Sequence, residues 1–168
     1  MRVCVVGGGA SGLVASLLIA QRGHSVVLLE KNEKLGKKIY ITGKGRCNLT
    51  NATTGNEFLQ NVVTNPKFVM SSEVRFNSND TMALFEDKGV PLKVERGNRV
   101  FPESDKASDI TRALERRLKL FNVDIRLSAE VECVLVEENL AKGVKLKSGE
   151  KVEADAVVVA TGGVSYPL

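Results

Sequence analysis

The feature that most constrains the fold is a run of glycines that directly follows a short apolar segment near the N-terminus. Val3-Cys4-Val5-Val6 lacks polar alternation, which is typical of a parallel strand buried on both faces. Gly7-Gly8-Gly9-Ala10-Ser11-Gly12 follows at once and has the spacing G-x-G-x-x-G. Residues 10–21 carry apolar side chains at helical spacing, and Gly23 provides a stop signal. This order predicts a strand, a glycine turn and a helix.

A second apolar run, Ser25-Val26-Val27-Leu28-Leu29, reads as another buried strand and leads directly to an acidic residue. That residue, Glu30, stands about twenty residues beyond the last glycine, where the dinucleotide fingerprint places an acid. Strand, glycine turn, helix, strand and acid therefore occur in the order of a dinucleotide-binding unit.

The chemistry of a dinucleotide explains this spacing. Gly7 permits the tight turn, Gly9 lets a pyrophosphate approach the backbone, and Gly12 lets the helix lie close to the strand. The helix start offers free N–H groups and a positive dipole end, so we assign phosphate contact to Gly7, Gly9, Ser11 and Gly12. Glu30 can accept hydrogen bonds from both ribose hydroxyls, and its charge repels a 2′-phosphate, which favours FAD or NAD over NADP. The alternative is a glycine turn that serves packing only.

The remaining elements follow from periodicity and turn residues. Two helices are expected between Thr53 and Gly89, one near residues 58–63 and one near 82–85, with Ser78, Asn79 and Asp80 as cap candidates for the second. Residues 91–96 and 99–101 form a hairpin around Gly97-Asn98. We further expect a helix at 105–121 with an apolar face (Ala107, Ile110, Leu114, Leu118, Phe121), a third parallel strand at 123–127, and an antiparallel meander at 131–136, 143–146 and 151–153.

A late apolar strand, Asp155 to Ala160, breaks at Thr161-Gly162-Gly163. The whole order of elements is that of FAD domains of the glutathione-reductase type, which moves the choice of cofactor from NAD to FAD. Gly162 and Gly163 would let the chain pass close to the flavin end of the cofactor, although a plain strand-ending turn is the alternative. The predicted fold is α/β: a Rossmann-like FAD-binding domain of the glutathione-reductase type, with a parallel sheet, helices and a small antiparallel β-meander.

A basic, glycine-rich segment follows the second strand and begins at Lys31. Its residues 36–51, together with Phe101-Pro102-Glu103-Ser104 and residues 160–167, resemble the signature of the BaiN/YhiN-type flavoproteins. These are NAD(P)/FAD-dependent oxidoreductases, also called aminoacetone oxidase-like. The resemblance covers the whole chain, and it implies that the segment lies by the flavin. Gly43, Gly45, Arg46, Cys47 and Asn48 match the family motif.

The basic segment has a second interpretation as a solvated loop, since most runs of charge are solvated. We retain Lys31, Gly45, Arg46 and Cys47 as cofactor-binding candidates because a loop after the second strand lies near the carboxyl edge of the sheet. Cys47 is either a reactive thiol whose pKa Arg46 lowers or a buried, inert one. The paired redox cysteines of disulfide-reductase flavoenzymes are absent from the sequence.

The resemblance also implies a family protein more than twice this long. Residues 1–168 are then the N-terminal part of a FAD/NAD(P)-binding domain, without the inserted second domain and the C-terminal return, and we expect this truncated domain to be inactive alone. The strand of Val157 and Val159 is expected to expose an apolar patch, which suggests a homo-oligomer or a missing partner chain.

Composition excludes several function classes. A charge of +4, 5% aromatic residues and no tryptophan argue against nucleic-acid binding. The longest apolar stretch, near residues 13–20, is well below the ~20 residues that span a bilayer, so no membrane association and a cytoplasmic location are expected. Three widely spaced cysteines indicate no metal site.

The sequence thus predicts the FAD-binding part of a flavin-dependent oxidoreductase that acts on an unknown small-molecule substrate, with NAD(P)H as a candidate electron donor. It identifies no catalytic residue. Two alternatives remain: a catalytically silent dinucleotide-binding module or half of a split enzyme, and an NAD-binding dehydrogenase half.

Overall fold

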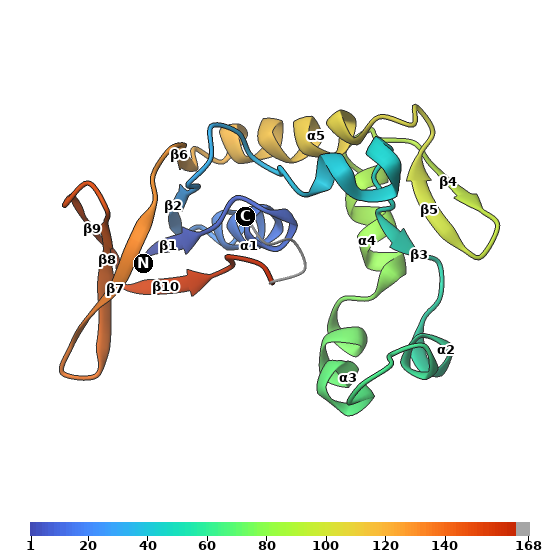
Figure 1. Ribbon diagram of the computed structural model, residues 1–168, viewed down its shortest axis with the longest axis horizontal. Coiled ribbons are helices and arrows are strands. Elements are labelled where there is room, and N and C mark those ends of the chain that lie inside the picture. The colour runs from blue at the N-terminus through green and yellow to red at the C-terminus, as the bar shows by residue number, and fades with distance from the viewer. Residues whose placement is uncertain (164–168) are drawn as a thin grey trace. The chain divides into compact units, whose positions relative to one another are not determined.

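A computed structural model describes residues 1–163 of the chain (Figure 1). The chain divides into two compact units. The first unit contains residues 1–39 and the part of the chain from Leu114 onward, and the second contains residues 40–113.

The first unit is built on a parallel sheet of four strands, β1 (Arg2–Val6), β2 (Ser25–Leu29), β6 (Asp124–Arg126) and β10 (Ala156–Val159). Their order in the sheet is β10-β1-β2-β6, and every neighbouring pair is parallel. Helix α1 (Ala10–Gln21) connects β1 to β2 and lies along these strands (Figure 1). The predicted strand–turn–helix–strand unit and the late parallel strand are therefore confirmed.

Burial explains why these segments adopt their structures. Residues 3–6 of β1 and 26–29 of β2 are all buried, as uninterrupted apolar runs in a central parallel pair require. On α1, Leu13 and Leu17 are one helical turn apart and fully buried. Gly23, with a φ of +82°, ends the helix region as expected.

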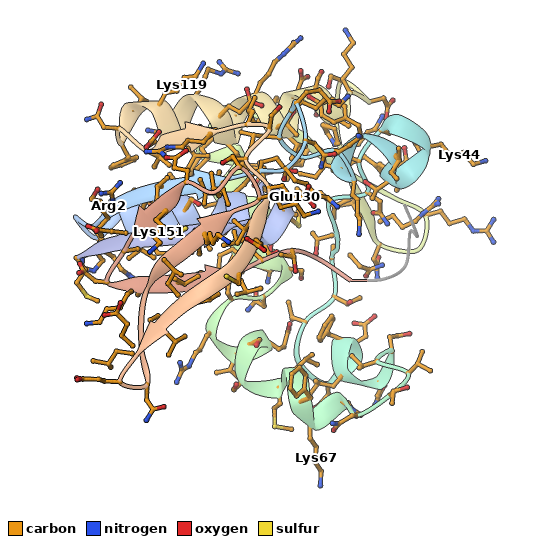
Figure 2. The ribbon with its side chains drawn as sticks, turned by 60° about the vertical axis from the view of Figure 1, so that its left-hand side comes forward. Arg2, Lys44, Lys67, Lys119, Glu130 and Lys151 are labelled. Carbon is orange, nitrogen blue, oxygen red and sulfur yellow. The ribbon has the colours of Figure 1, made fainter. Side chains whose placement is uncertain are left out.

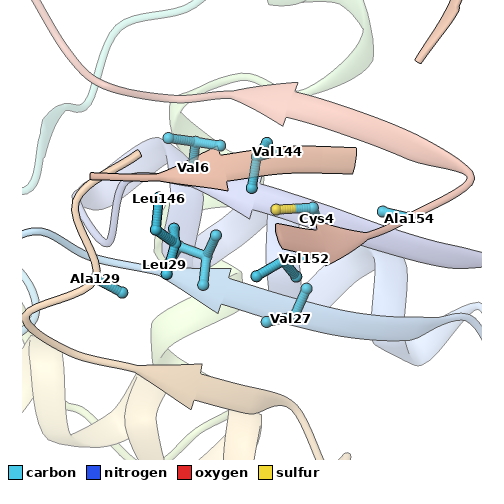
Figure 3. Packing of buried hydrophobic residues seen from close by; sticks show 9 residues of the cluster. All are labelled: Cys4, Val6, Val27, Leu29, Ala129, Val144, Leu146, Val152 and Ala154. Carbon is cyan, nitrogen blue, oxygen red and sulfur yellow. The ribbon is translucent and has the colours of Figure 1, made fainter. Parts of the chain in front are cut away.

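The second sheet of this unit is the predicted meander, formed by β7 (Val131–Glu137), β8 (Leu140–Leu146) and β9 (Lys151–Glu153). Its inner side chains pack against one face of the parallel sheet (Figure 3). The shared cluster contains Cys4, Val6, Val27, Leu29, Ala129, Val144, Leu146, Val152 and Ala154. This contact covers β1 and β2 from one side.

Strand β10 is an edge strand of the parallel sheet, and its exposure only partly matches expectation. Val159 is 65% exposed, whereas Val157 is partly buried and packs against the cluster beneath the meander. The prediction of an exposed patch holds for Val159 and is wrong for Val157, because the meander covers that side chain.

The second unit contains a small antiparallel sheet and three helices. The sheet has the order β3-β5-β4 and consists of β3 (Thr50–Asn51), β4 (Leu92–Glu95) and β5 (Arg99–Pro102), so the predicted hairpin is confirmed. The helices are α2 (Gly55–Gln60), α3 (Pro66–Arg75) and α4 (Ser78–Glu86). A 3₁₀ segment, η1 (Ile39–Gly45), leads into this unit from the first, and α5 (Ala107–Leu120) runs from it back into the first.

Two details of this region differ from the sequence prediction. Helix α3 was not predicted because Glu73 is its only buried residue, so no apolar stripe marks it. The cap of α4 is Asn77 rather than Ser78, Asn79 or Asp80. Its Oδ1 accepts hydrogen bonds from the backbone N–H groups of Asn79 and Asp80, and the Asp80 carboxylate accepts one from Asn77. Asp80 is thus the second member of a capping box.

Helix α5 and strand β6 follow the prediction closely. Ala107, Ile110, Leu114 and Leu118 are buried, as the helical spacing indicated. Phe121 lies beyond the last residue of the helix and is 39% exposed, so its assignment to the apolar face is wrong. Among residues 1–163, the helices are all too short or too polar to cross a bilayer.

Candidate dinucleotide-binding site

The glycine turn between β1 and α1 is held by backbone contacts that leave no room for a side chain at Gly7 or Gly12. Gly7 has a φ of +108° and donates its N–H to the Leu29 carbonyl, 2.8 Å away at the end of β2. A Cβ atom on Gly7 would overlap the carbonyl oxygen of Ala160. A Cβ on Gly12 would overlap the carbonyl oxygen of Gly7. Packing alone therefore requires glycine at positions 7 and 12.

Gly9 differs from these two glycines. It caps the N-terminus of α1 with an ordinary extended conformation (φ −81°), and an added Cβ would have no atom of the described chain within 4 Å. Neither backbone conformation nor packing in residues 1–163 explains a glycine here. The open space beside the helix start is where the fingerprint places a pyrophosphate, so the chain fits such a group on this side.

The N-terminus of α1 has the electrostatics of an anion site. Within the described chain, the Gly9 cap provides no side-chain hydrogen bond, and the first turn carries no acidic residue. The helical ladder begins with the bond from Leu13 N–H to the Gly9 carbonyl (2.9 Å), and Ser11 is exposed in the first turn. The first N–H groups of a helix lack partners within it and stand at the positive end of its dipole. An exposed start of this kind binds phosphate readily.

Glu30 follows β2 directly, and its carboxylate is buried against the glycine turn. Its Oε2 accepts the backbone N–H of Gly8 at 2.7 Å. Its Oε1 accepts both the backbone N–H and the side-chain amide of Asn32, at 2.8 and 2.6 Å. A carboxylate has about four acceptor positions, so one remains at Oε2 for a further donor. These hydrogen bonds hold the carboxylate in a fixed position beside the glycine turn.

Sequence reasoning missed Gly8, Asn32 and Leu35. A Cβ on Gly8 would overlap the side chain of Leu35 and lie 3.1 Å from Glu30 Cβ. The Gly8 carbonyl accepts the N–H of Gly36 at 2.8 Å, so the basic segment folds back onto the turn. Gly8 is a glycine at a position where the fingerprint does not require one, and this was the signal that could have revealed its close packing against Leu35 and Glu30.

The segment after β10 lies beside the same turn. Ala160 N–H donates to the Val6 carbonyl at 2.8 Å, and Gly162 has a φ of +82°. Lys38 Nζ donates to the Gly163 carbonyl at 3.0 Å, so the basic segment reaches Gly162 and Gly163 through this lysine. Val164, Ser165, Tyr166 and Pro167, which belong to the motif of the resemblance, lie outside the described residues.

Lys31 is exposed at the start of the basic segment. The pKa of Glu130 lies below its ordinary value, chiefly because Lys147 donates a hydrogen bond to it and to a smaller extent because of the charge of Lys31. Glu130, which is labelled in Figure 2, is exposed. No contact of Lys31 with the glycine turn is present among the contacts of the described chain, and its role as a cofactor ligand stays a prediction.

Gly45, Arg46 and Cys47 belong to the second unit. Gly45 and Cys47 have φ values of +88° and +62°, and Cys47 is 4% exposed. Burial raises the pKa of the Cys47 thiol, and a hydrogen bond with Thr42 offsets this only in part. The Arg46 guanidinium pairs with Glu95. Of the two alternatives for Cys47, the structure therefore favours the buried, inert thiol over the reactive one.

The part of the chain that the structure describes contains no recognisable metal-binding site. No group of three or more His, Cys, Asp or Glu side chains within residues 1–163 is arranged to hold a metal ion.

Comparison with known proteins gives a consistent result. The sequence model of a protein family described as "HI0933-like protein Rossmann domain" matches residues 1–168. The 3-dehydro-bile acid delta(4,6)-reductase of Clostridium scindens is 34% identical over 96% of this chain and 39% of its own length. The ribosomal RNA dihydrouridine synthase of Escherichia coli is 34% identical over 97% of this chain and 40% of its own length. The chain thus spans about two fifths of the length of these curated relatives.

Solved structures share the fold at lower sequence identity. A 3-ketosteroid-delta4-(5alpha)-dehydrogenase from Rhodococcus jostii RHA1 superposes with a TM-score of 0.73 at 15% identity, over 96% of this chain and 45% of that one. THI4 from Thermovibrio ammonificans gives a TM-score of 0.62 at 18% identity, over 96% and 57%. These likenesses show the α/β fold predicted from the sequence. Together with the relatives, which include FAD-dependent monooxygenases, the findings support FAD as the cofactor of this domain.

Proposed function

Because the chain belongs to the HI0933-like family of Rossmann-domain proteins, we propose that it holds FAD for a reductase of carbon–carbon double bonds conjugated with a carbonyl group. The observation that carries the cofactor part is the open space at Gly9 beside the uncapped start of α1. The chain spans about two fifths of its relatives, so the reaction is a proposal about the longer protein.

In this proposal, the pyrophosphate of FAD lies against Gly7, Gly9, Ser11 and Gly12. The acceptor position left at Glu30 Oε2 takes one hydroxyl of the adenosine ribose, and Asn32 holds the carboxylate in place for it. Burial among fixed donors makes such a carboxylate a well-oriented partner, because little freedom is lost when the ligand binds.

At the other end of the cofactor, we propose contacts from six further positions. Gly162 and Gly163 provide backbone without side chains, and Lys38 fixes their segment. Lys31 is proposed from its position directly after β2, and residues 45–47 are proposed from the family motif. When bound and reduced, FAD supplies a hydride equivalent, and NAD(P)H is the proposed source of its electrons.

The reaction class is supported by the names of two relatives that are equally similar to this chain. One is a delta(4,6)-reductase of a 3-dehydro-bile acid, and the other makes dihydrouridine in ribosomal RNA. In the substrates that both names describe, the carbon–carbon double bond that is reduced is conjugated with a carbonyl group. A net charge of only +4 and the absence of tryptophan favour a small molecule over RNA as the substrate of the present chain.

The cofactor is tested by the visible absorbance of the purified chain and by thermal unfolding with added FAD or NADH. A ligand at about 100 times its Kd stabilises the native state by about 2.7 kcal/mol. For a chain of this size, each kcal/mol raises Tm by about 2 to 4 °C, so FAD should raise Tm by about 5 to 10 °C. Stabilisation by NADH alone would favour an NAD-binding dehydrogenase half. The absence of any FAD effect would contradict a working cofactor site in this chain.

The reaction is tested under anaerobic conditions with FAD, NADH or NADPH, and either a steroid that carries a 3-oxo group and a Δ4 double bond or a uridine-containing ribosomal RNA fragment. Oxidation of the nicotinamide that depends on the steroid supports the proposal. Turnover with RNA alone would replace the substrate class. The assay is repeated with the chain fused to the remaining part of a relative. If FAD binds in both proteins but neither shows turnover, a catalytically silent module is favoured.

A further inference from the structure

The segment from Gly43 to Cys47 has an unusual backbone. Gly43, Lys44, Gly45 and Cys47 have φ values of +56°, +59°, +88° and +62°, so four of these five residues are left-handed. Two of the four are not glycine, and left-handed conformations at such residues persist only where surrounding contacts hold them. Lys44 does not provide these contacts through its ammonium group, because its side chain extends away from the ribbon (Figure 2).

Arg46 makes the side-chain ion pairs that join this segment to the β4–β5 hairpin, in addition to the backbone bond from Leu49 N–H to the Val100 carbonyl just after the segment. Its Nη1 and Nη2 lie 2.8 and 3.3 Å from the two carboxylate oxygens of Glu95, which is a two-point contact from the end of β4. Nη1 also lies 3.3 Å from Oδ1 of Asp105, just beyond β5. Lys93 completes the network with its Nζ 2.7 Å from Asp105 Oδ2.

Phe101 connects the guanidinium of Arg46 to the backbone of the segment. The guanidinium carbon lies 4.0 Å from the centroid of the Phe101 ring, which is almost fully buried. The same ring closes the space beside Gly43, where an added Cβ would lie 2.8 Å from Phe101 Cε1 and 2.8 Å from the Asn48 nitrogen. Arg46 and Gly43 therefore both lie against the ring of Phe101, which links the guanidinium to the backbone of the segment.

The charges in this network are balanced. Arg46 and Lys93 carry two positive charges, and Glu95 and Asp105 carry two negative charges. Hydrogen bonding to Glu95 raises the pKa of Arg46 above its ordinary value, so the guanidinium stays charged and paired. A guanidinium that is already held by two carboxylates has less attraction for the phosphates or flavin oxygens of a cofactor.

We propose that Arg46 is a positioning residue that holds the left-handed backbone of residues 43–47 through Glu95, Asp105 and Phe101 and does not itself touch the cofactor. The inference rests on the proposed function, in which this segment serves FAD. It changes the role of Arg46 from ligand contact to support of the segment.

The first test measures the backbone of the full chain without any cofactor. In Arg46→Ala, hydrogen–deuterium exchange of the amides of residues 43–48 should rise about tenfold, since local opening no longer breaks the ion pairs. Glu95→Gln should raise exchange in the same segment. Arg99→Ala is the matched control, because Arg99 lies 5.8 Å from the Phe101 centroid and donates to the Arg96 carbonyl. Unchanged exchange in Arg46→Ala overturns the proposal.

The second test measures FAD affinity by fluorescence titration. If Arg46 acts through the segment, Arg46→Ala and Glu95→Gln each weaken FAD binding about tenfold, and the double variant is no weaker than Arg46→Ala. A direct contact predicts instead that Glu95→Gln binds FAD as well as the wild type while Arg46→Ala does not, and this outcome overturns the proposal. If the wild-type chain binds no FAD, the proposed function and the role of Arg46 toward the cofactor both fail, whereas the exchange data still decide whether Arg46 holds the segment.

Discussion

Replacing Gly9 with alanine separates cofactor binding from folding more cleanly than any other change in the glycine turn. The added methyl group would enter open space, with no atom of residues 1–163 within 4 Å, and the φ of −81° suits any L-residue. Alanine lowers the conformational entropy of the unfolded chain, which stabilises the folded state by about 0.4 to 1 kcal/mol. It is a poorer helix cap than glycine by a similar amount. The two effects nearly cancel, so we expect Tm to change by less than about 4 °C.

The effect of Gly9→Ala on FAD should be much larger. The methyl group would lie where the pyrophosphate approaches the first turn of α1 and would keep it from the backbone N–H groups. Hydrogen bonds to charged groups contribute about 1.5 to 3 kcal/mol each. Loss of two of them corresponds to about 3 to 6 kcal/mol, and therefore to a Kd that rises about 10²- to 10⁴-fold.

The assay combines FAD titration, followed by flavin fluorescence, with thermal unfolding of the same samples. Gly12→Ala is the matched control, because its methyl group would overlap the carbonyl oxygen of Gly7. That variant should lose about 1 to 3 kcal/mol of stability through overpacking, before any ligand is added. Wild-type FAD affinity in Gly9→Ala would refute the assignment of the pyrophosphate to this turn. A large loss of stability in Gly9→Ala would refute the geometry of the open space.

Three further predictions concern Glu30, the cysteines and Asp105. Glu30→Ala removes the acceptor for the N–H groups of Gly8 and Asn32, so urea unfolding without FAD should show a free energy of unfolding lower by about 1 to 3 kcal/mol. Titration should show a loss of FAD binding energy of similar size, and an unchanged Kd would exclude the ribose contact. Of the three thiols, only the exposed Cys133 should react rapidly with a disulfide reagent near about pH 8, because the other two are buried and burial raises the pKa of Cys4 to about 11; fast labelling of more than one thiol in the native chain would contradict this. A hydrogen bond from Lys93 is the chief reason that the pKa of Asp105 lies below its ordinary value of 3.8. The wild type should therefore be more stable than Asp105→Asn above pH 3.8, and this difference should disappear as the pH falls through the lowered pKa. A difference in unfolding free energy that does not depend on pH would contradict that role.

The sequence by itself determined which segments form the strands of the parallel sheet, their order along the chain and the position of the glycine turn. All three depend on local signals. Uninterrupted apolar runs are typical of strands buried on both faces, as β1 and β2 are, and a further apolar run marks β10. Gly7, Gly9 and Gly12 occupy fingerprint positions whose reasons are steric. The position of Glu30 beside the glycine turn was predicted from a local signal too, because one helix and one strand set its distance along the chain from the turn.

Only the tertiary structure decided which partners those residues find. Glu30 is shared between Gly8 and Asn32, Lys38 reaches Gly163, and Val157 is covered by the meander. The family resemblance implied a flavin-side contact for Arg46, and that contact stays a prediction. The structure adds that the charge of Arg46 is paired with Glu95 and Asp105, which are 49 and 59 residues further along the chain. Contacts over such sequence separations depend on how the hairpin and the segment fold together, and the local pattern around a residue carries no information about them.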